Sequence, residues 1–93
     1  MMFNAQARSA LRALYALREE YRHYIKRGYE DAEGLGRRVW ALNYLEDLIF
    51  ESPDPPLVVI GKFGNKMNVY AKINSDFDDC VLACETLDAM LTG

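Results

Sequence analysis

The stretch LVVIGKFGNKMNVYAKI, residues 57–73, decides the fold class that the sequence predicts. Two runs rich in apolar and β-branched residues, LVVIGKF and KMNVYAKI, flank the dipeptide Gly64-Asn65. Strands favour such runs, and a Gly/Asn pair between them is typical of a two-residue β-turn. Residues 57–73 are therefore predicted to form a two-stranded antiparallel β-hairpin.

The alternation of side chains along this hairpin predicts two faces. The face expected to cover the helices holds Val58, Ile60, Met67, Val69, Ala71 and Ile73. The outer face holds Leu57, Val59, Phe63 and Tyr70 with Lys66, Asn68 and Lys72, and it is too apolar to be left in water. A lone two-stranded sheet is marginal, and both of its edges offer unpaired backbone groups.

We therefore expect a foreign partner or a second copy of the chain to add a strand to the hairpin or to cover its outer face. A homodimer through the β-hairpin is the simplest form, because a two-fold axis lets one strand pair with its own copy. The alternative is that the N-terminal residues or the last helix fold over this face within one chain.

Helices are predicted on either side of the hairpin. Residues 3–27 repeat apolar side chains at helical spacing, and Gly28 after two cations is a normal helix end. A second helix begins between Asp31 and Gly36 and runs to about Glu51, where SPDPP breaks it. A third covers most of residues 74–93, with Ser75 or Asp76 as its N-cap. The predicted fold class is α+β, in the order α-α-β-β-α: an αα-hairpin, the β-hairpin and a C-terminal helix.

Length and composition predict one small globular domain over residues 1–93. The apolar fraction of 51% and the charged fraction of 27% argue against disorder. Arg8 and Arg12 stand where a secretory signal would be apolar, and no uncharged run could span a bilayer, so we expect a cytoplasmic protein with no membrane partner. Cys80 and Cys84, four residues apart on the third helix, are expected to be buried thiols rather than a disulfide or a zinc site.

The first helix carries a basic stripe on its polar face: Arg8, Arg12, Tyr15, Arg18, Arg22 and Lys26. Cations with an interleaved aromatic are what a phosphate-binding helix shows. The competing explanation is a solvated or internally paired face, since residues 51–93 hold three Lys or Arg against seven Asp or Glu and the chain carries a net charge of −3. The negative net charge of the chain favours this competing explanation.

The second helix has two features of interest. Trp40 and Tyr44 lie outside its main apolar stripe, and such side chains are favoured at protein interfaces. The alternative is that the third helix or the hairpin covers them. Glu46 falls inside the apolar arc, so it needs a partner, for which an arginine of the first helix is a candidate, unless it sits at the margin of the arc. The predicted protein-interaction residues are Trp40, Tyr44, Val59, Phe63 and Tyr70.

The sequence matches phosphate-binding, calcium-binding and catalytic motifs only weakly. GLGRR at 34–38 lacks the strand and spacing of a phosphate loop. Asn74, Asp76, Asp78 and Glu85 match calcium-ligand positions, but Asp79 replaces the turn glycine and the segment fits a continuous helix. The one histidine, His23, has no nucleophile near it in sequence. We expect no catalytic residues, no metal and no cofactor.

The predicted function is a small non-enzymatic protein-interaction module: a regulator, adaptor or inhibitor of the kind carried by phages and mobile elements. The partner expected is another protein. The alternative is a nucleic-acid-binding domain that uses the basic stripe. A small enzyme or a metal-binding domain is a distant third.

Overall fold

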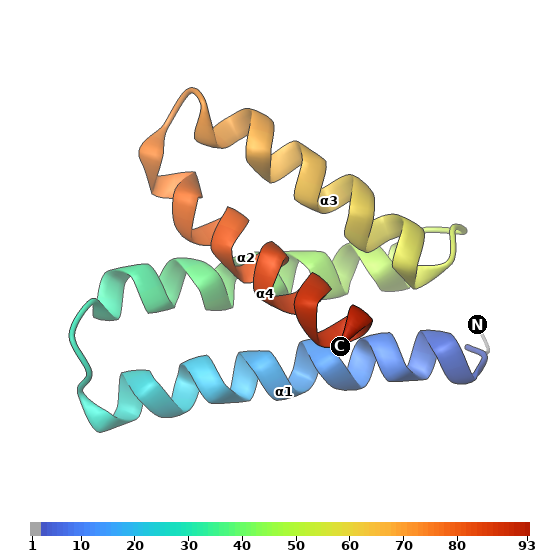
Figure 1. Cartoon of the computed structure of the whole chain (residues 1–93), viewed down its shortest axis with the longest axis horizontal. Helices are drawn as coiled ribbons and strands as arrows, with labels where there is room; N and C mark the ends of the chain where they lie inside the picture. Colours follow the sequence, from blue (N-terminus) through green and yellow to red (C-terminus); the bar gives the residue numbers. More distant parts are fainter. Residues whose placement is uncertain (1–2) are drawn as a thin grey trace.

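The computed structural model describes residues 3–93, and within them it contains helices and no strand (Figure 1). The elements are α1 (Ala5–Arg27), α2 (Ala32–Glu51), α3 (Pro56–Ala71), the 3₁₀ turn η1 (Ser75–Phe77) and α4 (Asp78–Thr92). The fold is an all-α four-helix bundle. The predicted α+β class was therefore wrong, and the error is confined to one segment.

The first two helices form the predicted αα-hairpin. The side chain of Asn4 accepts a hydrogen bond from the Ala7 amide at 2.8 Å and so caps α1, and Gly28 ends it in the left-handed conformation at φ 76°. Asp31 caps α2 by accepting from the Gly34 amide. The predicted ends of both helices are confirmed to within a few residues.

Residues 57–73, predicted as a β-hairpin, form α3 and the turn that follows it. Pro55 and Pro56 open this helix, and Pro suits a first helical position because no intrahelical partner awaits its missing N–H. The most deeply buried side chains of α3 are Val59, Ile60, Phe63 and Met67. A strand would divide these four between two opposite faces, whereas a helix puts them all on one. Burial of the whole set favours the helix.

This correction reverses several predicted exposures. Val59 and Phe63, expected on an outer face, are core residues that are 7% and 2% exposed. Val58, Val69 and Ile73, expected to cover the helices, are 44%, 54% and 83% exposed. Since residues 57–73 contain no strand, the predicted homodimer through a β-hairpin has no edge on which to form.

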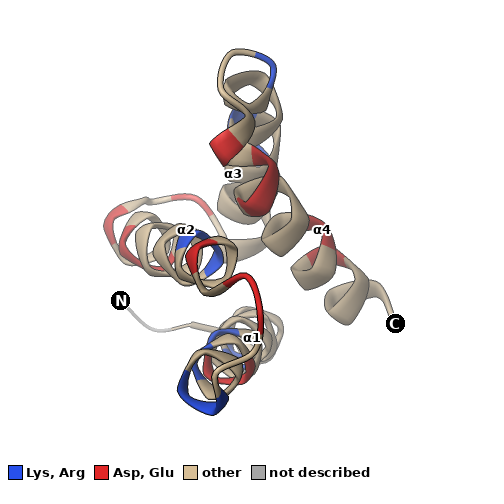
Figure 2. Cartoon of the chain, turned by 90° about the vertical axis from the view of Figure 1, so that its left-hand side faces the viewer, with Lys and Arg blue, Asp and Glu red and all other residues tan. Residues whose placement is uncertain are grey.

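The four helices pack as two hairpins around one core. Helices α1 and α2 run side by side, α3 lies beyond α2, and α4 returns across them (Figure 1). The view along α1 and α2 shows α3 above α2, with α4 on one side of both (Figure 2). The largest fully buried side chains are Leu14, Leu17, Leu42, Leu45, Ile49, Met67, Leu87 and Cys80. None of the helices in residues 3–93 is long and apolar enough to cross a membrane.

The C-terminal helix matches its prediction with a shifted start. The predicted N-cap, Ser75 or Asp76, was wrong: both lie in η1, which Asn74 caps by accepting from the Asp76 amide at 2.9 Å, and α4 begins at Asp78 with no side-chain cap. Cys80 and Cys84 are free and buried, as predicted. The face of α4 that carries the two cysteines therefore packs on the core.

Candidate functional site

A continuous row of aromatic side chains joins α2, α3 and η1. We call these five residues the aromatic row: Phe63, Tyr44, Trp40, Phe77 and Tyr70. Neighbouring rings meet edge to face, with centroids 5.9 Å apart for Phe63 and Tyr44 and 5.6 Å for Tyr44 and Trp40. Trp40 and Phe77 follow at 6.4 Å, and Phe77 and Tyr70 at 5.2 Å. These geometries are those that aromatic pairs prefer.

The row is only partly covered. Trp40 is 48% exposed, Tyr44 40% and Tyr70 39%, while Phe63 is buried against Tyr44 and Phe77 is half-buried. Four of the five predicted interaction residues lie in the row, and the fifth, Val59, lies in the core. Phe77 is the member that the sequence analysis missed, because its role depends on η1 folding back toward α2.

Two hollows lie beside the row, one at Trp40 and Phe77 and the other at Phe63. One, of about 220 Å³, is lined by Arg37, Trp40, Asn74, Asp76, Phe77 and Cys80. The other, of about 170 Å³, is lined by Leu48, Ser52, Asp54, Val59, Lys62, Phe63 and Lys66. Each hollow could take one or two side chains of a protein partner rather than a whole cofactor.

Ion pairs fix the part of the row where Trp40 meets Phe77. Arg37 Nε donates to Asp79 Oδ2 at 2.8 Å, and Arg38 lies 3.4 Å from the other oxygen of the same carboxylate. The hydrogen bond to Asp79 raises the pKa of Arg37. These contacts tie the start of α2 to the start of α4, and so they hold Trp40 against Phe77.

The basic stripe of α1 is partly used within the chain. Arg18 donates to Glu46 Oε1 at 2.7 Å and to the Asn43 side chain at 2.9 Å, and its guanidinium lies over the Tyr15 ring at 5.2 Å. This hydrogen bond from Arg18 lowers the pKa of Glu46, a shift that Arg22 reinforces by its charge. The predicted partner of Glu46 is thus confirmed.

The rest of the stripe faces solvent. The Arg8 side chain donates to the Phe3 carbonyl at 2.7 Å. Arg12, Arg22 and Lys26 are exposed and form no ion pair with any residue of 3–93. Three free cations are a small basic surface for a chain with a net charge of −3.

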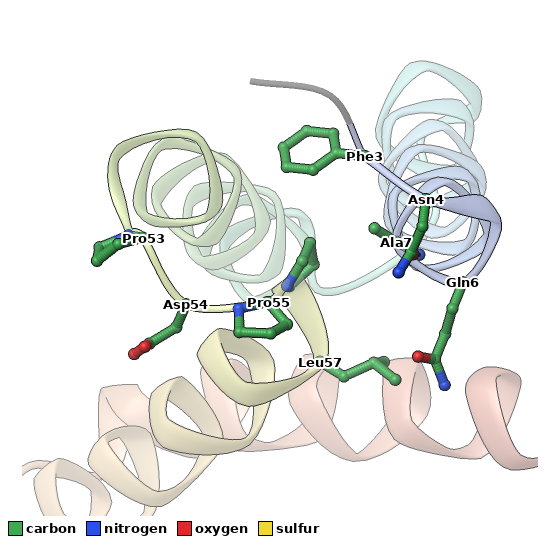
Figure 3. Close-up of a pocket in the computed structure, with 9 residues that line it drawn as sticks. Phe3, Asn4, Gln6, Ala7, Pro53, Asp54, Pro55 and Leu57 are labelled. Carbon is green, nitrogen blue, oxygen red and sulfur yellow. The ribbon is translucent and has the colours of Figure 1, made fainter.

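A further pocket lies between the N-terminus and the link from α2 to α3. Its walls are Phe3, Asn4, Gln6 and Ala7 on one side and residues 53–57 on the other, around about 190 Å³ (Figure 3). Asp54 is its one ionisable side chain among the described residues, and Lys62 holds that carboxylate at 3.1 Å. The pocket offers no acid–base pair and no nucleophile.

In the part of the chain that the structure describes, neither the thiols nor the possible metal ligands form a reactive site. Burial raises the pKa of the Cys84 thiol to about 12 and that of Cys80 as well, which makes both weak nucleophiles. Within residues 3–93, no three His, Cys, Asp or Glu side chains are grouped so that they could hold a metal ion. The calcium-like positions are occupied by the cap of η1 and by α4, which is a helix and not a calcium loop.

No protein-family model, curated protein or solved structure matches this chain. The aromatic row is therefore the candidate site on the strength of its own geometry.

Proposed function

We propose that this chain is a small non-enzymatic protein-interaction module, a regulator, adaptor or inhibitor, whose contact surface is the aromatic row. The observation that supports this proposal is the partial exposure of Trp40, Tyr44 and Tyr70 within one connected row. Trp and Tyr dominate the energetics of protein interfaces, and a contiguous exposed apolar patch is a common mark of a binding surface.

The row is also held in place before any partner arrives. Each exposed ring packs edge to face on another ring: Tyr44 on the buried Phe63, and Trp40 and Tyr70 on the half-buried Phe77. A partner that packs on the row thus loses little side-chain entropy, because the rings are already ordered. Preorganised aromatic side chains are what a protein-binding surface needs.

The surroundings support a binding role in the cytoplasm. The two thiols are free and buried, which suits a reducing compartment.

The side chains around the row also suit binding more than catalysis. His23 is exposed on α1, far along the chain from the two thiols. The hollows beside the row are smaller than the roughly 300–1,000 Å³ of typical small-molecule sites, so a protein partner fits them better.

Affinity purification from the native cell tests this proposal. The wild-type chain and the double variant Trp40→Ala/Tyr70→Ala are used as baits, and the matched control is Tyr29→Ala/Phe50→Ala, two exposed aromatics outside the row. We expect the control to retain the same partner protein as the wild type. The row variant should lose at least about tenfold in recovery, since removal of a hot-spot aromatic costs about 2 kcal/mol or more and about 1.4 kcal/mol corresponds to tenfold.

Circular dichroism of each bait checks that its helices are intact. Equal recovery of the partner by the row variant and the wild type would contradict the proposal.

A further inference from the structure

Two pairs of charged residues continue the exposed faces of α2 and α3 beyond the aromatic row. On α2, Asp47 and Glu51 follow Tyr44 by three and seven residues, which places them on the same exposed face of the helix. We call this pair the acidic wall. On α3, Lys62 and Lys66 precede Tyr70 by eight and four residues and form the basic wall.

The two walls stand at the same level along the surface between α2 and α3, which we call the groove and which has a hollow at each end. The hollow at the Phe63 end is lined by Leu48 and Ser52, each next to one residue of the acidic wall, and by both lysines of the basic wall. At the other end, Trp40 on α2 and Tyr70 on α3 both contact Phe77, which lies between their rings in the row.

The walls do not neutralise each other within one chain. Asp47, Glu51 and Lys66 form no ion pair with any residue of 3–93, and Lys62 reaches only the partly exposed Asp54. An occupant of the groove therefore meets acid on one side and base on the other at the Phe63 end, and the rings of Trp40, Phe77 and Tyr70 at the other end.

We propose that a second copy of this chain occupies the groove, in a symmetric dimer whose two-fold axis runs along it. This axis sets the acidic wall of each copy against the basic wall of the other. It also sets Trp40 of each copy against Tyr70 of the other copy and against the nearby Ile73, whose side chain is 83% exposed. An axis across the groove would oppose like charges and is unfavourable.

The inference rests on the proposed function, because it names one occupant of the same surface. Only one occupant can cover the row at a time. Dimerisation thus competes with a foreign partner, and the dimer is the form in which the free chain shields its aromatic surface.

Charge reversal of each wall tests the dimer. The first variant, Asp47→Lys/Glu51→Lys, makes both walls basic, and the second, Lys62→Glu/Lys66→Glu, makes both acidic. We expect the wild type to have twice the chain mass of 10.7 kDa in light scattering at concentrations up to about 1 mM. Each variant alone should be monomeric, because its opposed walls repel.

A one-to-one mixture of the two variants should restore the doubled mass, because every wall then meets its opposite. Fluorescence of Trp40, the one tryptophan of the chain, should shift to shorter wavelength in the mixture and in neither variant alone. The control Arg12→Glu/Lys26→Glu reverses charges on α1 and should leave the mass of the wild-type dimer unchanged.

Two results would overturn the dimer: a monomeric wild type across this range, or a mixture that stays monomeric. A monomeric chain whose partner recovery still depends on Trp40 and Tyr70 would refute the dimer alone and leave the proposed function standing. A dimer with no Trp40-dependent partner would refute the function alone.

Discussion

Arg18 is the side chain through which the polar face of α1 joins the rest of the molecule. Its guanidinium serves Glu46 and Asn43 of α2 and stacks on Tyr15, and the side chain is only 13% exposed. A carboxylate in a mainly apolar arc is stabilising only while such a partner is present. At this position the chain uses one cation of the basic stripe to make an acidic side chain tolerable at the helix–helix interface.

Acid should therefore weaken the fold partly through Glu46. The hydrogen bond from Arg18 puts its folded-state pKa below the ordinary 4.5, so its contribution is present above about pH 4.5 and is lost as pH falls through the folded-state value. Arg18→Met should lower the free energy of unfolding at pH 7 by about 1–2 kcal/mol. The measurement is urea unfolding between pH 7 and pH 3.

The variant Glu46→Gln should show a shallower loss of stability below pH 4.5 than the wild type. Glu19→Gln, on the exposed side of α1, is the control and should follow the wild type. Identical acid profiles for Glu46→Gln and the wild type would show that the pair contributes nothing to the pH dependence.

At the scale of the elements, the sequence predicts a helix well where local signals and burial agree. Helices α1 and α2 each combine a capping residue with apolar residues at helical spacing, and α4 has the same spacing and follows η1, which Asn74 caps. In residues 57–73 these signals conflict: β-branched residues and Gly64-Asn65 favour a hairpin, while Pro55-Pro56 and the spacing of Ile60, Phe63 and Met67 favour a helix. Core packing favours the helix, because only a helix buries one continuous apolar face of this segment against α2 and α4.

The candidate site was predictable only in part. Trp40 and Tyr44 follow from α2 alone, since they lie off its apolar stripe. Tyr70 was assigned to an exposed face for a reason that proved wrong, as was Phe63. Phe77 could not be assigned to the row from sequence, because its contacts to Trp40 and Tyr70 arise from the turn between α3 and α4.

Two glycines distinguish a helical α3 from a hairpin. A Cβ at Gly61 would meet nothing within 4 Å, and one at Gly64 would make an ordinary contact with Cys84 at 3.7 Å. Because alanine is the better helix former, Gly61→Ala and Gly64→Ala should each raise the free energy of unfolding by roughly 0.5–1 kcal/mol. Chemical denaturation measures both.

The comparison is sharpest at Gly64, which a two-residue β-turn would hold at positive φ. There alanine would be strained and destabilising. A destabilised Gly64→Ala protein would thus contradict α3 as a helix. Gly28→Ala serves as the reference for real strain, since Gly28 has a φ of 76° and its replacement should destabilise.

At the scale of the whole molecule, α1 presents the remaining cations along its length. Its 23 residues span about 35 Å at 1.5 Å per residue, close to the longest dimension of 38 Å. Because Arg18 is bound to Glu46, it cannot also bind a phosphate. The cations left at the centre and end of the stripe are Arg12, Arg22 and Lys26. The net charge of −3 opposes an approach to any polyanion.

These charges predict no useful affinity for nucleic acid. If three cations neutralise three phosphates, affinity falls about 20-fold between 50 and 150 mM salt, and exposed contacts are already screened at that ionic strength. Fluorescence anisotropy with labelled duplex and single-stranded DNA should therefore show no binding at about 150 mM salt. Any retention at low salt should vanish in Arg12→Gln/Arg22→Gln/Lys26→Gln and persist in Lys62→Gln/Lys66→Gln. Sub-micromolar binding at about 150 mM, lost in the α1 variant, would instead make the basic stripe the functional surface, because three screened contacts alone cannot reach that affinity.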